Sequence, residues 1–209
     1  MGTPLFPQVA GLVLDGGHAS RFDGAHKAFL EVGGRPIAER TVELFRELFG
    51  ELLVATRQPE PWLSFDVRLV DDPVENAGPL GGIAGGLLAT DRGWLVAVAG
   101  DMPFLNRALL QHLVERALEG PERVIVPLRR GQVEPLHAVH PQAYAERAAE
   151  LVRGGTRRVT DYFAEVDAEE IEVSTLGIEG ATDSFININR GEEWLAVRDV
   201  KVDEEGSCA

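Results

Sequence analysis

The chain has 209 residues, with 34 acidic and 20 basic side chains, a formal net charge of −14 and a hydrophobic fraction of 44%. This length and composition fit one ordinary globular domain and exclude a disordered or fibrous chain. The acidic excess argues against nucleic acid polymers and membranes as partners, because binding them requires clustered Lys and Arg. Residues 164–209 carry −10 and residues 1–163 only −4, so the first three quarters can still bind a small anionic ligand.

The chain has a single cysteine, Cys208. One cysteine excludes an internal disulfide and a cysteine-based metal site, and this usage is typical of a reducing compartment. The longest uninterrupted apolar run, residues 94–99, is far too short to cross a bilayer. We therefore expect a cytoplasmic protein.

The first half of the chain alternates short apolar runs with longer helical patterns. The apolar runs predict strands over residues 9–14, 52–55, 67–70, 94–99 and 124–126. Helices are predicted from Pro36, from about Pro79 and over residues 106–118. The strands are apolar throughout and alternate with helices, a pattern typical of a mostly parallel sheet that is buried on both faces.

The second half is less regular. It predicts a strand over 134–139, helices over 141–153, 156–163 and 192–198, and extended segments over 170–173 and 185–188. No linker divides the chain. We therefore predict a single α/β domain over residues 1–198, with three α/β/α layers around a mostly parallel, Rossmann-like sheet, followed by an acidic tail over 199–209 that we expect to be disordered.

Polar residues follow three of the predicted strands, where ligands bind in an open parallel sheet. They are Asp15-Gly16-Gly17 after the first, Asp71-Asp72-Pro73 after the third and Gly100-Asp101 after the fourth. Glycines let backbone N–H groups approach phosphates, and Arg21 and Lys27 supply positive charge nearby. A carboxylate beside phosphates requires a bridging hard cation such as Mg²⁺. Together these residues predict a site for a magnesium-bound nucleotide.

Each piece alone also has a plain structural explanation. Gly16-Gly17 and Asp72-Pro73 are ordinary turn sequences. Lys27 favours a phosphate contact over a chance surface charge, because the chain holds 18 arginines and only two lysines. The chain lacks G-x-G-x-x-G, P-loop and G-x-S-x-G motifs. We interpret the glycines at 81, 82, 85 and 86 as close helix–sheet packing, and expect His137 and His140 to hydrogen-bond locally or contact substrate.

Several segments together resemble one enzyme family. L-D-G-G-H-A-S-R-F-D-G-A-H-K at 14–27 resembles the L-A-G-G-x-S-x-R-[MF]-G-x-[DN]-K signature of the molybdenum cofactor guanylyltransferases (MobA type). G-P-L-G-G-I at 78–83 and G-D-M-P-F at 100–104 resemble two further family segments, and 134–139, 155–159 and 185–189 follow in family order. The resemblance covers residues 9–198. Asp15, Asp23 and His26 depart from the signature, which has Ala, Gly and Asp or Asn there.

The resemblance implies a fold of the nucleotide-diphospho-sugar transferase type and transfer of GMP from Mg·GTP to molybdopterin, with release of pyrophosphate. It implies Arg21, Lys27 and Asp101 as catalytic residues and Asp101, Asn187 and Asn189 around Mg²⁺. The implied nucleotide-binding residues are Leu14, Asp15, Gly16, Gly17, Lys27, Asp71, Gly78, Pro79, Leu80 and Asp101. Molybdoenzymes and other cofactor-biosynthesis proteins are candidate partners.

Two other functions stay open at this point. One is a related nucleotidyltransferase with another nucleotide or acceptor, such as the cytidine form of the cofactor or a sugar phosphate. The other is a catalytically weak nucleotide-binding or cofactor-delivery protein. Gly16-Gly17 together with G-P-L at 78–80 favours guanine, because cytidylyl-transferring relatives usually carry L-A-A-G at the first position. His137, Arg157 and Arg158 are candidates for the acceptor side, although helix-end salt bridges explain the two arginines equally well.

Overall fold

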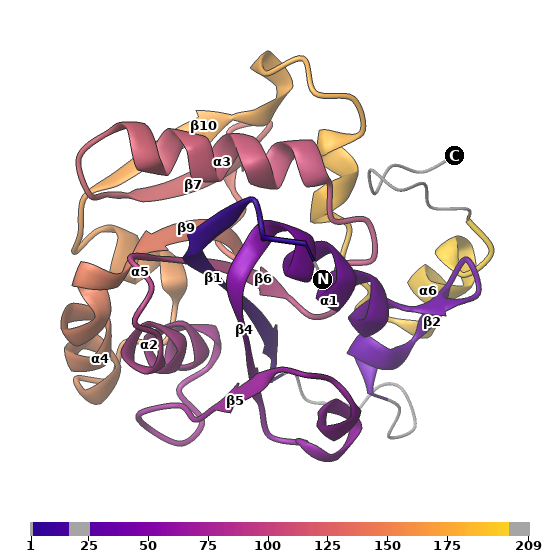
Figure 1. Cartoon of the computed structure of the whole chain (residues 1–209), viewed down its shortest axis with the longest axis horizontal. Coiled ribbons are helices and arrows are strands. Elements are labelled where there is room, and N and C mark those ends of the chain that lie inside the picture. Colours follow the sequence, from indigo (N-terminus) through magenta and orange to yellow (C-terminus); the bar gives the residue numbers. More distant parts are fainter. Residues whose placement is uncertain (1, 17–25, 201–209) are drawn as a thin grey trace.

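The computed structural model describes residues 2–16 and 26–200, and within them an eight-stranded sheet forms the centre of the molecule (Figure 1). The strand order is β10-β7-β9-β6-β1-β4-β5, and β8 pairs with β7 beside this path. The strands are β1 (Phe6–Asp15), β4 (Phe49–Thr56), β5 (Arg68–Val70), β6 (Trp94–Ala99), β7 (Val124–Arg129), β8 (Gln132–Val133), β9 (His137–Pro141) and β10 (Ala168–Glu172).

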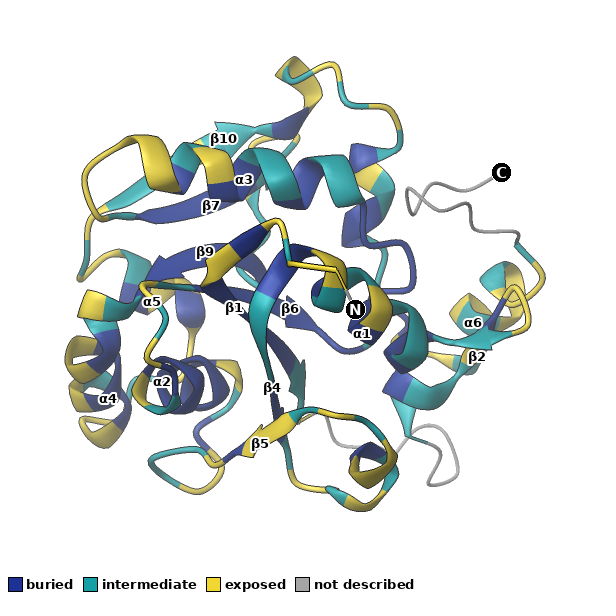
Figure 2. Cartoon of the chain, in the orientation of Figure 1, coloured by how far each residue is buried: buried dark blue, intermediate teal, exposed yellow. Residues whose placement is uncertain are grey.

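Helices cover both faces of this sheet and complete three layers. Helices α1 (Ile37–Leu48) and α3 (Arg107–Glu119) bury their apolar sides on one face. Helices α2 (Pro79–Ala89), α4 (Ala145–Arg153) and α5 (Val159–Phe163) pack on the other. The central strands are the most deeply buried part of the chain (Figure 2). The predicted α/β class and layering are confirmed.

The predicted strands match the observed ones within a few residues, and 94–99 matches β6 at both ends. Strands β1, β4, β5 and β6 are mutually parallel. The mixed part of the sheet was not predicted: β9 is inserted between β6 and β7 and runs antiparallel to both. Hydrophobic pattern fixes which faces are buried, but it carries little information about which strands become neighbours.

Two predictions for the second half were wrong in detail. The helix predicted from Pro141 begins at Ala145, because Pro141 is the last residue of β9 and a 3₁₀ turn (Gln142–Tyr144) intervenes. The segment predicted as extended over 185–188 pairs with no described strand, since Phe185 ends a 3₁₀ helix (Ala181–Phe185). The backbone N–H of Ile188 instead donates to the carbonyl of Asp101, 3.0 Å away.

Helix α2 approaches the sheet unusually closely, as its glycines predicted. A Cβ on Gly82 would lie 2.6 Å from Cδ2 of Leu14, and a Cβ on Gly85 would lie 2.2 Å from the carbonyl oxygen of Asp71. Real Cβ atoms are not found so close to other heavy atoms. The bare glycine surface therefore lets α2 rest directly on the ends of β1 and β5.

A small C-terminal unit packs against the hairpin of β2 (Glu31–Val32) and β3 (Arg35–Pro36). Its helix α6 (Gly191–Val197) is tied down by the Trp194 indole, which donates to the carbonyl of Glu31 at 2.8 Å. The carbonyl of Val200 lies 2.7 Å from a Cβ placed on Gly33, so the packed structure extends two residues into the predicted tail. Residues 201–209 lie outside the described residues.

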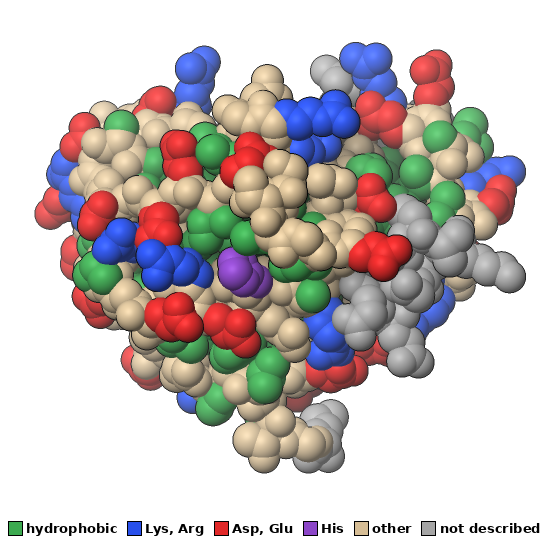
Figure 3. Space-filling view, turned by 90° about the horizontal axis from the view of Figure 1, so that it is seen from above, with side chains coloured by type: hydrophobic (Ala, Val, Ile, Leu, Met, Phe, Trp, Pro, Cys, Tyr) green, Lys and Arg blue, Asp and Glu red, His purple; other side chains and the backbone are tan. Residues whose placement is uncertain are grey.

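The surface over α3 and β10 carries charges of both signs. Figure 3 shows Lys and Arg side chains interleaved with Asp and Glu on this face, without a continuous basic area. Glu169 illustrates the pattern, because it pairs with both Arg116 and Arg123. Among the described residues, no helix is both long and apolar enough to cross a membrane.

Candidate functional site

A large open cavity lies beyond the carboxyl ends of β1, β4, β5 and β6, beside the start of α2. Its volume is about 1280 Å³. Pockets for one small ligand usually enclose about 300–1,000 Å³, so this cavity has room for a nucleotide and part of a second substrate. Its position is the one that an open parallel sheet predicts for a ligand.

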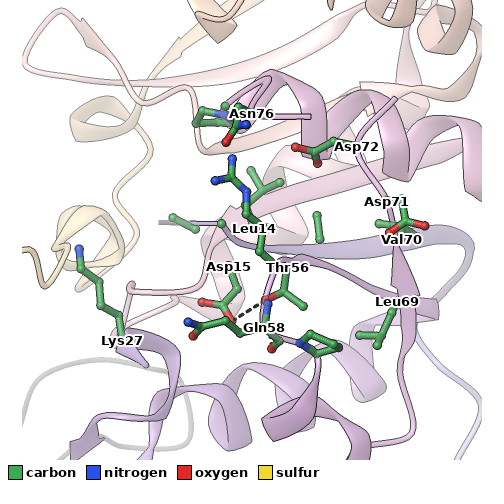
Figure 4. Close-up of a pocket in the computed structure, with 18 of the residues that line it drawn as sticks. Leu14, Asp15, Lys27, Thr56, Gln58, Leu69, Val70, Asp71, Asp72 and Asn76 are labelled. Atoms are coloured by element: carbon green, nitrogen blue, oxygen red, sulfur yellow. Dashed lines mark hydrogen bonds between the residues drawn. The ribbon is translucent and has the colours of Figure 1, made fainter. Parts of the chain in front are cut away.

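Most of the residues predicted from sequence do meet at this cavity. The lining includes Leu14, Asp15, Gly16, Lys27, Asp71, Gly78, Pro79 and Asp101 (Figure 4). Leu80 is a correction: its side chain is fully buried between α2 and the sheet, because the position after Pro79 faces the core. Gly17 and Arg21 lie outside the described residues.

Lys27 connects the two sides of the predicted catalytic centre. Its ammonium lies 3.1 Å from Oδ2 of Asp101 and 3.0 Å from Oδ1 of Asn189. Lys27 comes from the 3₁₀ turn η1 (Lys27–Phe29), Asp101 follows β6, and Asn189 follows the segment that Ile188 ties to Asp101. Three segments far apart in the sequence thus converge on one positive charge. Both acceptors are hard oxygen atoms, of the kind that also suits a divalent cation.

Asn187 supplies a further oxygen close by in the chain. Its side-chain Oδ1 is buried and accepts no hydrogen bond from any described residue. The described residues contain no cluster of three or more His, Cys, Asp or Glu side chains that could hold a metal. A donor set with one carboxylate and amide oxygens fits Mg²⁺, which keeps few protein ligands and takes the rest from water and substrate phosphates.

Asp15 is held by donors on the side of the cavity away from α2. Its Oδ2 accepts a 2.7 Å hydrogen bond from the indole of Trp62 and a longer one, 3.5 Å, from the hydroxyl of Thr56. Nδ1 of His26 lies 3.1 Å from the same oxygen. Burial raises the pKa of Asp15 to about 6, against the opposing effects of the Trp62 hydrogen bond and His26. The carboxylate is therefore costly to ionise despite these donors.

Asp71 and Asp72 take different positions on the α2 side. Asp71 is exposed, and in Figure 4 its carboxylate points away from Leu14 and Asp15. Asp72 is half-buried, points back into the cavity, and lies 2.9 Å from a Cβ placed on Gly81. Burial raises the pKa of Asp72, and the charge of Arg57 opposes this shift. No described residue donates a hydrogen bond to the Asp72 carboxylate, so it can accept one from a ligand.

The acceptor-side candidates His137, Arg157 and Arg158 are not among the residues that line this cavity. His137 and His140 are fully buried within β9 without a hydrogen-bond partner among the described residues, and burial lowers the pKa of each to about 3. Both expectations for these histidines were wrong, because β9 lies inside the sheet. Arg157 donates to the carbonyls of Val152 and Thr156 and so caps the end of α4.

Sequence reasoning missed the residues that β4 and the following turn supply. Thr56, Arg57 and Gln58 line the cavity, and Trp62 reaches Asp15 from the 3₁₀ helix η2 (Glu60–Ser64). The strand-end rule that identified Asp15 and Asp101 also applies to β4. Applied there, it would have pointed to Thr56 and Arg57. No local pattern predicts the Trp62 contact, which joins residues 47 positions apart.

Comparison with known proteins gives consistent matches in sequence. A family model described as the MobA-like NTP transferase domain matches residues 11–169. A probable molybdenum cofactor guanylyltransferase from Peptoclostridium acidaminophilum is 27% identical over 200 residues, covering 93% of this chain and 90% of that protein. A molybdenum cofactor guanylyltransferase from Pseudomonas aeruginosa is 34% identical over 170 residues, covering 80% and 86%.

Solved structures match the fold. Molybdopterin-guanine dinucleotide biosynthesis protein A from Archaeoglobus fulgidus superposes with a TM-score of 0.78 at 22% identity, covering 91% of this chain and 97% of that one. 2-C-methyl-D-erythritol 4-phosphate cytidylyltransferase from Thermus thermophilus gives 0.63 at 20% identity, covering 90% and 96%. At such identities the likeness establishes the fold alone.

Proposed function

Because the chain belongs to the MobA-like NTP transferase family and is a nucleotidyltransferase, we propose that it transfers GMP from Mg·GTP to molybdopterin. The products are molybdopterin guanine dinucleotide and pyrophosphate. The observation that carries this proposal is the convergence of Asp101 and Asn189 on Lys27, at a cavity with room for a nucleotide and part of a second substrate. The choice of guanine as the base and of molybdopterin as the acceptor follows from the names of the relatives.

In this reaction the terminal phosphate of molybdopterin attacks the α-phosphorus of GTP, a P–O bond forms, and the bond to the β-phosphate breaks. The protein contributes mainly position and charge. Asp101, with Asn187 and Asn189, would hold Mg²⁺, which neutralises phosphate charge when bound. Lys27, which contacts Asp101 and Asn189, would also bind the phosphates, and we propose Arg21 as a second positive charge for them.

The nucleoside would lie on the α2 side, where Leu14, Gly16, Gly78 and Pro79 form the surface. Guanine carries adjacent N–H donors at N1 and N2, and a carboxylate accepts from both. Asp71 stays a proposed contact from the family resemblance. The half-buried Asp72 has the better position for this role, since it faces the cavity and no described residue donates to it.

Nucleotide selectivity tests this proposal. Calorimetric titration of the chain with GTP, CTP, UTP and ATP, each with Mg²⁺, should show the tightest binding for GTP. Pyrophosphate release in the presence of GTP and molybdopterin should fall about a hundredfold or more in Asp101→Ala, because one fixed charge contact contributes about 2.7–4 kcal/mol to the transition state. The matched control is Asp91→Ala, which removes an exposed carboxylate before β6.

Other outcomes separate the remaining functions. Preferred binding of CTP would indicate the cytidine form of the cofactor, and pyrophosphate release with a sugar phosphate would indicate a different acceptor. Tight GTP binding without any release would indicate a delivery protein. Association with molybdoenzymes and a cytoplasmic location stay proposals that rest on the function itself and on the cysteine count.

A further inference from the structure

Asp15 and His26 flank residues 16–25 in the sequence and meet in space. Oδ2 of Asp15 and Nδ1 of His26 are 3.1 Å apart, and their side chains are only 9% and 13% exposed. Nδ1 of His26 forms no hydrogen bond with a described residue, so the two side chains are in close contact without a regular hydrogen bond. This contact joins the end of β1 to the residue that precedes Lys27.

Trp62 holds the same carboxylate from a second direction. Its indole donates to Oδ2 of Asp15 at 2.7 Å, and its side chain is fully buried. Phe29, from the same turn as Lys27, packs edge-on against both His26 and Trp62, with ring centroids 5.3 and 5.2 Å apart. A rigid aromatic group therefore supports the polar contact and leaves little freedom for the turn that carries Lys27.

The direction of Asp15 explains how an acid is tolerated in a phosphate site. Successive strand residues point to opposite sides of a sheet. Leu14 points towards Gly82 of α2, and Asp15 therefore points towards His26 and Trp62. Both Asp15 and His26 depart from the family signature, which has Ala at the first position and Asp or Asn at the second. An Asp at both positions would place two carboxylates in contact, so the two departures compensate for each other.

We propose that Asp15, His26 and Trp62 form a clasp that fixes the start of the Lys27 turn relative to β1, and that Asp15 and His26 are positioning residues for the nucleotide phosphates. The role in nucleotide binding rests on the proposed use of Mg·GTP. The existence of the clasp does not rest on Mg·GTP, because the energetic coupling between Asp15 and His26 is present without nucleotide. The two claims can therefore fail separately.

A double-mutant cycle on the full chain tests the clasp. The variants are Asp15→Ala, His26→Asp and the double substitution, with Asp91→Ala as a control outside the cavity. In the native background, Asp15→Ala should lower the urea midpoint, because it leaves the buried Trp62 donor unpaired. In the His26→Asp background, the same substitution should raise the midpoint, because it relieves a contact between two carboxylates. An equal change in both backgrounds would overturn the clasp.

The positioning role is tested on the same variants at temperatures where all are folded. Asp15→Ala should raise KM for Mg·GTP about tenfold and change kcat much less, because the turn that carries Lys27 is then no longer held in place before the nucleotide binds. Asp15→Asn keeps an acceptor for Trp62 and should recover most of the affinity. An unchanged KM with a lowered urea midpoint would show that the clasp stabilises the fold and has no positioning role. If the native chain binds no Mg·GTP, the proposed function and the positioning role fall together, while the unfolding cycle still decides the clasp.

Discussion

The two sides of the cavity each present a carboxylate, nearly buried for Asp15 and half-buried for Asp72, and the surroundings of the two differ. Asp15 accepts hydrogen bonds from Trp62 at 2.7 Å and Thr56 at 3.5 Å, and Nδ1 of His26 lies 3.1 Å away. Asp72 lies over the bare glycine surface of α2, and no described residue donates to it. Burial raises the pKa of both. The difference indicates that the Asp15 carboxylate is already engaged by protein donors and that the Asp72 carboxylate is open to the substrate.

The largest expected effect concerns the pH dependence of stability. Asp15 has a pKa of about 6 in the folded chain against an ordinary value of 3.8, so the folded state binds the proton more tightly. The resulting stabilisation is complete below the ordinary value and is lost as pH rises through about 6. Relative to Asp15→Asn, the native free energy of unfolding should fall by up to about 3 kcal/mol across this window. Urea titrations at several pH values measure it, and a difference independent of pH would contradict the account.

The next effect concerns the affinity for Mg·GTP, which should depend more on Asp72 than on its neighbour Asp71. Asp72→Asn should weaken Mg·GTP binding about tenfold or more, because a charged acceptor contributes about 1.5–3 kcal/mol to a hydrogen bond. Asp71→Asn is the matched control and should change the affinity less, since Asp71 is exposed and points away from Leu14. Calorimetric titration distinguishes them. A larger loss in Asp71→Asn would reverse the assignment of the two carboxylates.

Glycine substitutions test whether the close approach of α2 to the sheet requires residues without a Cβ. Gly85→Ala should destabilise the fold by about 1–3 kcal/mol, because its Cβ would lie 2.2 Å from the carbonyl of Asp71 and would push the 71–72 turn outwards. Gly93→Ala is the control, since no atom lies within 4 Å of its Cβ, and it should change stability by less than about 0.5 kcal/mol. Denaturation of both variants gives the comparison. Equal effects would mean that the close approach of α2 is not required.

The smallest effect is expected for a carboxylate outside the cavity. Glu165 pairs with Arg147 on the surface at 2.5 Å, with both side chains nearly half exposed. Because solvent screens such pairs, Glu165→Gln should change the free energy of unfolding by less than about 1 kcal/mol. Thermal melts at low and high salt measure this. A change as large as that of Asp15→Asn would show that burial is not what distinguishes the cavity carboxylates.

The sequence carried enough information for the architecture and for the rim of the site. Apolar runs located β1, β4, β5 and β6, and parallel pairing then required Asp15, Asp71 and Asp101 to meet at one edge. The glycines of α2 were also interpreted correctly, because four glycines on one short helix have few other uses. These inferences depend on local pattern and on one general rule for parallel sheets.

The sequence did not reveal which side chains touch across long separations. The contact of Trp62 with Asp15, the burial of His137 and His140 inside β9, and the insertion of β9 itself depend on tertiary neighbours. The choice between Asp71 and Asp72 depends on where a turn directs two adjacent side chains. Such features follow from packing between segments, and hydrophobic periodicity carries no information about it.

The most direct test of the account is transfer of label from GTP to the acceptor. The native chain is incubated with Mg²⁺, molybdopterin and GTP labelled at the α-phosphate, and the products are separated. We expect the label to appear in molybdopterin guanine dinucleotide, and the rate of transfer to fall about a hundredfold or more in Asp101→Ala but not in Asp91→Ala. Label that stays in GTP, or that is transferred only from CTP, would contradict it.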